Sequence, residues 1–141
     1  MTLFTKFVRV VLIVLLFFLS VTAALGGIAL MVNFYAPPVE SLQGSIFPNF
    51  VIPGLALSVI VGGSALFAAI LLLQKSKYAL LFAATAGIII MFFEFVEVLV
   101  IGAPTGPSLV MQVAYFGMGT LIEIMTMGMW FLSLRAFNQI F

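Results

Sequence analysis

The sequence contains no cysteine, no histidine and no aspartate. Without thiols or imidazoles, the chain cannot form a disulfide, a zinc site of the usual kind, a haem site or a catalytic triad that uses imidazole. No nucleophile–base pair and no cofactor motif is visible either. We therefore expect no metal site and no cofactor, and we do not expect an enzyme.

Charge is also scarce. Only 6% of the 141 residues are charged, and 65% are hydrophobic. A soluble domain is about 45–50% apolar and about 25% charged, so this chain has too few polar groups to cover a water-soluble fold. A basic surface for nucleic acid is missing as well. The composition predicts one integral membrane domain over residues 1–141, with the lipid bilayer as its surroundings.

Four stretches are long enough to cross the bilayer, which takes about 20 mostly apolar residues. The predicted spans are about 7–32, 51–73, 79–101 and 109–134. Proline, glycine and short polar segments separate them, and the longest separating segment is an outer loop over residues 33–50. The first apolar run exceeds the about 7–15 residues of a signal peptide, so we interpret it as a retained helix.

The positive charges predict the orientation of these spans. Lys6 and Arg9 precede the first span, Lys75 and Lys77 lie between the second and third, and Arg135 follows the fourth. The two loops on the opposite side contain no Lys or Arg. Because positive residues favour the cytoplasmic side, we expect both termini in the cytoplasm.

Short connections predict an all-α, up-down-up-down transmembrane four-helix bundle. Small residues recur at helical spacing along the spans and favour close helix contacts, within the chain or between copies. The candidate packing residues are Gly27, Gly54, Ser58, Gly62, Ala65, Gly87 and Gly119.

Three of the four glutamates lie inside predicted spans, where an ionised side chain costs about 2.5–3.5 kcal/mol at the helix centre. Glu94 and Glu97 share one face of the third span, and Gln112 and Tyr115 come at a similar depth on the fourth. These four side chains predict a polar pocket near the outer side. Glu123 lies too deep in the fourth span to reach Glu97.

Two interpretations of the glutamates stay open. In the first, they form a proton or cation relay, or a site for a cationic or polar ligand. In the second, they are protonated and form hydrogen bonds between helices, each worth about 0.6 kcal/mol. The outer loop over residues 33–50 is similarly ambiguous. It is rich in apolar residues and predicts either a lid over the pocket or a segment lying in the membrane interface.

Several segments resemble a widespread group of small four-helix bacterial membrane proteins of unknown function. They are residues 42–55 (LQGSIFPNFVIPGL), Gly26-Gly27, residues 97–102 and residues 112–119. The chain departs from that group after the first span, where residues 33–37 read NFYAP instead of the common Asp-Pro-Ser-Gly. The resemblance implies the four-helix topology and a bacterial cytoplasmic (inner) membrane, but no activity.

Two functions follow as hypotheses. The first is a non-enzymatic accessory subunit that packs against another membrane protein or a second copy of itself. The alternative is a small carrier or ligand-binding protein, alone or as a dimer, for a proton-coupled, cationic or hydrophobic solute. In the alternative, the glutamates of the third and fourth spans are the functional groups.

Overall fold

The computed structural model describes the backbone of residues 2–34, 36–102 and 105–138, and the side chains among them up to Arg135. In this part of the chain all regular secondary structure is helical, and there is no β-strand. The elements are α1 (Leu3–Met31), η1 (Val39–Leu42), α2 (Val51–Ala56), η2 (Leu57–Gly62), α3 (Gly63–Leu73), α4 (Ala79–Ile101) and α5 (Pro107–Asn138).

Four helical rods account for almost all of the fold, because α2, η2 and α3 follow one another without a break. The described residues hold four candidate spans that are long and apolar enough to cross a membrane: Leu3–Met31, Val51–Leu73, Ala79–Ile101 and Pro107–Arg135. The all-helical fold and the number of long apolar helices are therefore confirmed.

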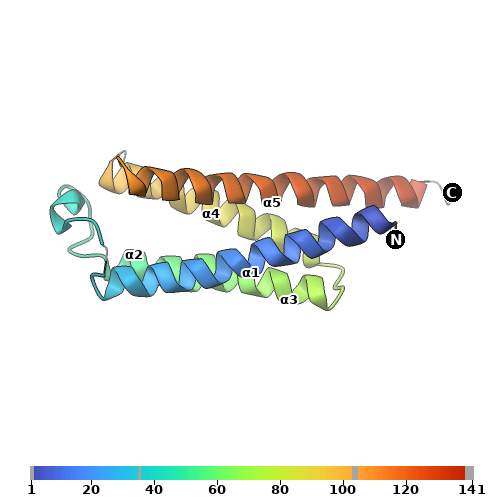
Figure 1. Ribbon diagram of the computed structural model, residues 1–141, viewed down its shortest axis with the longest axis horizontal. Helices are drawn as coiled ribbons and strands as arrows, with labels where there is room; N and C mark the ends of the chain where they lie inside the picture. Colours follow the sequence, from blue (N-terminus) through green and yellow to red (C-terminus); the bar gives the residue numbers. More distant parts are fainter. Residues whose placement is uncertain (1, 35, 103–104, 139–141) are drawn as a thin grey trace.

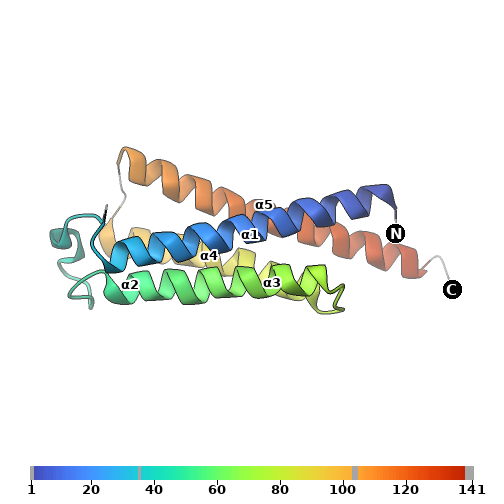
Figure 2. The same cartoon turned by 60° about the horizontal axis from the view of Figure 1, so that its bottom comes forward.

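Figures 1 and 2 show the four rods side by side. The 3-10 turn η1 and the start of α5 lie at one end of the bundle, and the turn between α3 and α4 lies at the other. The beginning of α1 and the last turns of α5 lie toward the end that carries this turn. Helix α5 packs chiefly on α4 and to a lesser extent on α1.

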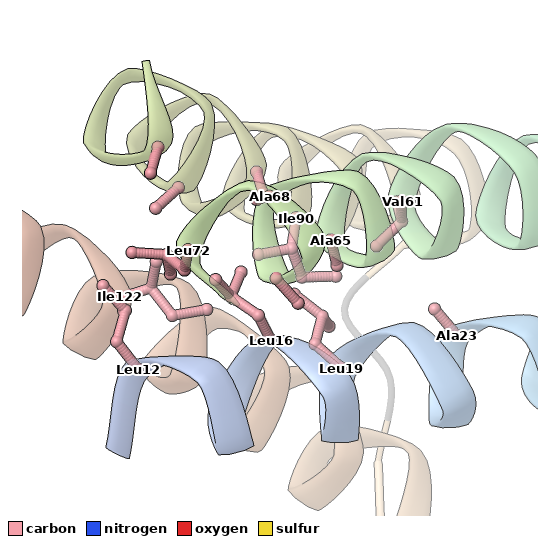
Figure 3. Close-up of a cluster of buried hydrophobic side chains, with 14 residues drawn as sticks. Leu12, Leu16, Leu19, Ala23, Val61, Ala65, Ala68, Leu72, Ile90 and Ile122 are labelled. Atoms are coloured by element: carbon pink, nitrogen blue, oxygen red, sulfur yellow. The ribbon is translucent and has the colours of Figure 1, made fainter. Parts of the chain in front are cut away.

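The core lies where α1, α3, α4 and α5 meet. Leucines of α1 point toward alanines of α3, so that large side chains fill the space that small ones leave (Figure 3). The largest apolar contributors that are fully buried are Leu12, Leu16, Leu19, Leu72, Ile90, Ile122 and Val61. Outward-facing side chains are apolar as well, and Phe92 and Leu99 are 65% and 69% exposed. Such a surface suits contact with lipid rather than with water.

Helices α1 and α2 approach closely at two glycines. A Cβ atom on Gly27 would collide with the carbonyl oxygen of Gly54 and with the hydroxyl of Ser58. A Cβ on Gly54 would lie 2.5 Å from the carbonyl oxygen of Gly27. The Ser58 hydroxyl also donates a hydrogen bond of 3.2 Å to the carbonyl oxygen of Ala24. Only residues without a side chain allow these two backbones to come so near.

A second close contact joins α4 to α5. A Cβ on Gly119 would lie 2.9 Å from the carbonyl oxygen of Gly87 and 2.6 Å from Cγ of Met91. The remaining candidate packing residues also face the inside of the bundle, since Gly62 is buried against α1 and Ala65 is fully buried in the core.

The helix ends differ from the predicted spans in α1 and in α5, and α5 runs on to Asn138. Helix α1 begins at Leu3 because the Thr2 hydroxyl caps it, accepting a bond of 3.3 Å from the Thr5 amide. Helix α5 begins at Pro107, where the missing N–H of proline costs nothing. Gly102 and Gly106, with φ of 78° and 64°, allow the chain to turn between α4 and α5.

The π-helical segment η2 was not predicted. It lies inside the second span, and its composition of leucine, valine, isoleucine, serine and glycine is the same as that of the turns around it. A π turn inserts one residue into the helical repeat and changes which side chains face a neighbour. In this chain the segment carries Ser58 and Gly62 to the contact with α1.

Candidate functional site

A cavity of about 450 Å³ lies between α4 and α5, in the halves of the two helices that meet near Gly102. We call it the α4–α5 groove. Its polar lining residues are Glu94 of α4 and Gln112 of α5. Apolar walls come from Phe95 and Val98 of α4 and from Val113 and Phe116 of α5. Because Phe95, Val113 and Phe116 are exposed, the groove opens sideways, on the outer surface of the helices.

Glu94 is the acidic residue that lines the groove, and 5% of its surface is exposed. It stands on the face of α4 that also carries Gly87 and Ile90, and this face packs into the bundle. A carboxyl group held among apolar side chains requires a hydrogen-bond partner or an opposite charge to offset the loss of water.

Gln112 faces Glu94 from α5 and is 8% exposed. Its Nε2 atom is buried and has no hydrogen-bond partner. A buried donor without a hydrogen-bond partner costs about 1–3 kcal/mol, so this amide favours an acceptor nearby, either a group that enters the groove or the neighbouring Glu97 carboxyl group.

Glu97 lies one turn beyond Glu94 and is half-buried. Its carboxyl group is close enough to Glu94 and to the side chain of Gln112 to interact electrostatically with both, although Nε2 of Gln112 makes no hydrogen bond. Glu97 does not line the groove, and neither does Tyr115, which packs against the core. Of the four side chains of the predicted pocket, the structure therefore brings two into the groove and a third beside it.

Glu123 lies elsewhere in the α4–α5 contact. Its Oε1 atom is 2.5 Å from the position that a Cβ on Gly87 would take, and Oε1 has no hydrogen-bond partner. Gly87 precedes Glu94 by two helical turns, which is roughly 10 Å along the axis. One turn further along α5, Thr126 is fully buried and its hydroxyl also lacks a partner. Unsatisfied polar atoms thus extend along the buried face of α5.

The groove has no cationic partner in the described part of the chain. The Lys and Arg residues all belong to the other end of the bundle: the first turns of α1 (Lys6 and Arg9), the turn before α4 (Lys75 and Lys77) and the last turns of α5 (Arg135). The Arg9 guanidinium is occupied there, since its Nε and Nη2 both donate to the carbonyl oxygen of Leu72, with 3.0 Å from Nε. The glutamates are left without an ion pair.

Sequence reasoning missed the apolar walls of the groove. Phe95 and Val98 follow Glu94 by one and four residues, and Val113 and Phe116 follow Gln112 by the same intervals. This matched spacing was the available signal, but nearly every face of these helices is apolar, so it did not stand out.

The α4–α5 groove combines polar and apolar side chains. No group of three or more acidic side chains in the described residues is placed to hold a metal ion. The groove offers one carboxyl group, one amide and an apolar lining, which is the usual make-up of a small-molecule site. No family of known proteins, no curated protein and no solved structure matches this chain.

Proposed function

We propose that this chain is an integral protein of a bacterial cytoplasmic membrane whose four spans cross in alternating directions. Both termini and the turn between α3 and α4 are on the cytoplasmic side. All five positive charges of the sequence support this orientation, because they belong to these three places. In Figure 1 the beginning of α1 and the last turns of α5 lie toward the same end of the bundle as the turn between α3 and α4, and this arrangement supports the alternating directions.

Within this membrane we propose that the α4–α5 groove binds an amphiphilic organic cation, as a small carrier or binding protein would. The observation that carries the proposal is the carboxyl group of Glu94, 5% exposed at the wall of a sideways-opening apolar groove and without a Lys or Arg partner in the described chain. A cation with an apolar body satisfies both parts of the site. Its charge offsets the buried carboxylate, and its body replaces lipid against the walls.

Equilibrium binding of tetraphenylphosphonium, a permanent lipophilic cation, tests the proposal on the purified protein in zwitterionic nanodiscs. We expect saturable binding to the wild type and a loss of at least about tenfold in affinity, or 1.4 kcal/mol, for Glu94→Gln. The amide keeps the shape of the side chain and removes the charge.

Glu40→Gln is the matched control, because it makes the same chemical change on the exposed face of η1. We expect it to bind as the wild type does. Unsaturable binding, or equal affinity of Glu94→Gln and the wild type, would overturn the proposal, provided that size-exclusion and circular-dichroism profiles show folded protein.

An accessory subunit is the second candidate function, and one observation favours it. Gly117 and Gly128 of α5 are exposed, and a Cβ on either would meet nothing within 4 Å. Eleven residues apart, they share a helix face on which another membrane helix could pack closely. Gly128→Leu, followed by gentle purification of the chain from its membrane, tests this candidate, because Gly128, unlike Gly117, does not line the α4–α5 groove. Loss of a stoichiometric partner or of a dimer supports it, and an unchanged monomer contradicts it.

A further inference from the structure

A second cavity, of about 320 Å³, lies at the opposite end of the bundle from the α4–α5 groove. It is lined by Lys77, Tyr78, Leu80 and Leu81 from the start of α4 and by Trp130 and Ser133 from the last turns of α5. We call it the basal groove. None of these residues lines the α4–α5 groove, where the cation is proposed to bind.

The charge around the basal groove is of one sign. All five Lys and Arg residues belong to this end of the bundle, whereas the four glutamates belong to η1, to the second half of α4 and to the middle of α5. The Lys77 ammonium is held over the ring of Tyr78, 4.9 Å from its centre. A cation therefore stands at the mouth of a groove that no acidic side chain lines.

The backbone adds hydrogen-bond donors to this charge. No side chain caps α4 at Tyr78. The Ala79 N–H donates to the Ser76 carbonyl oxygen at 3.1 Å, whereas the next N–H groups of the first turn have no partner within the helix. Leu80 and Leu81, which carry two of these groups, line the groove. Together with the Lys77 ammonium, these N–H groups suit an anion with several oxygens, such as a phosphate.

The aromatic residues indicate where that phosphate comes from. Trp130 and Tyr78, 42% and 52% exposed, stand at the rim, and these two residue types collect at the level of lipid headgroups. The Ser133 hydroxyl donates to the carbonyl oxygen of Trp130 at 2.6 Å. Its proton is therefore not available to a ligand in the groove. The side chains of Leu80 and Leu81, the second of them 51% exposed, suit contact with the upper part of an acyl chain.

We propose that the basal groove binds the headgroup of an anionic phospholipid, with the phosphate at Lys77 and the start of α4 and the acyl chains along Trp130. This site is independent of the cation proposed for the α4–α5 groove.

Trp130 is the single tryptophan of the sequence, so its fluorescence reports on this groove alone. The experiment uses nanodiscs that contain phosphatidylglycerol or phosphatidylcholine brominated near the top of the acyl chains. We expect brominated phosphatidylglycerol to quench Trp130 at a mole fraction about fivefold lower than brominated phosphatidylcholine does, the effect of about one lysine near an anionic surface. In Lys77→Gln this difference is lost.

Lys75→Gln is the matched control, because Lys75 lies on the same turn without lining the groove, and we expect it to keep the difference. Equal quenching by the two lipids would overturn the proposal, because the groove would then have no preference for an anionic headgroup. Equal effects of both lysine variants would overturn it too, since diffuse attraction then explains the preference. Reversal of the quenching by inorganic phosphate would overturn it as well, because the groove would then hold a free anion and not a lipid.

Discussion

The Oε1 atom of Glu123 occupies the space beside Gly87, 2.5 Å from where a Cβ on that glycine would stand. The same glycine of α4 also contacts the backbone of Gly119, which lies one turn before Glu123 on α5. Glycine at this position therefore serves both the approach of the two helices and the placement of a carboxyl group between them.

Gly87→Ala should destabilise the fold by about 1–3 kcal/mol, because the new methyl group must displace Glu123 and part of α5. Unfolding in denaturing detergent, followed by circular dichroism, measures the change. Gly63→Ala is the control, since a Cβ there meets nothing within 4 Å, and it should change stability by less than about 1 kcal/mol. A Gly87→Ala protein as stable as the wild type would show that the contact is loose.

The glycine pair at the end of α1 offers a sharper comparison between neighbours. Gly27→Ala places a methyl group against the Gly54 carbonyl and the Ser58 amide, which are backbone atoms and cannot rotate away. Gly26→Ala meets only the Leu57 side chain, at 3.5 Å. We expect Gly27→Ala to lose about 3 kcal/mol or to fail to accumulate, and Gly26→Ala to stay within about 1 kcal/mol of the wild type. Equal stabilities would contradict the close approach of α1 and α2.

Arg9 should fix the end of α3 to α1. Because its Nε and Nη2 both bond to the Leu72 carbonyl, Arg9→Gln should cost about 1–2 kcal/mol, and Arg9→Lys, which keeps the charge but loses the paired donors, should cost less. The same unfolding assay applies. Lys6→Gln, an exposed neighbour without a hydrogen bond of this kind, should change stability by at most about 0.5 kcal/mol. Similar losses for both residues would show that only net charge matters.

The aromatic wall of the α4–α5 groove should contribute to ligand binding. Phe95→Ala removes a lining side chain and should weaken tetraphenylphosphonium binding about fivefold, which corresponds to about 1 kcal/mol of aromatic contact. Phe92→Ala removes an exposed ring of the same helix that does not line the groove, and it should bind normally. Two equal losses would mean that the cation binds to the general apolar surface.

Hydropathy and the positions of proline and glycine were enough to locate the four helices. The second and third spans match Val51–Leu73 and Ala79–Ile101 at both ends, because Pro53, Lys75 and Gly102 interrupt the apolar pattern close to these limits. The start of α1 was placed too late, since the capping hydroxyl of Thr2 lies outside the apolar run. The π turn carries no compositional signal.

The candidate site was predictable only in its polar half. Spacing and depth indicated that Glu94 and Gln112 face each other, and both line the groove. Tyr115 came at a suitable depth but points to the core, because one residue turns a helix by about 100° and depth alone does not give direction. The apolar walls could not be distinguished from faces that contact lipid, since both consist of the same residue types.

The pH dependence of tetraphenylphosphonium binding tests most directly the claim that Glu94 binds a cation. A proton and a cation compete for the same carboxylate, so the affinity of the wild type should rise as the pH is raised. Glu97→Gln should keep this rise, and Glu94→Gln should bind weakly with no dependence on pH. A pH dependence that survives in Glu94→Gln, or an affinity of the wild type that does not change with pH, would contradict the account.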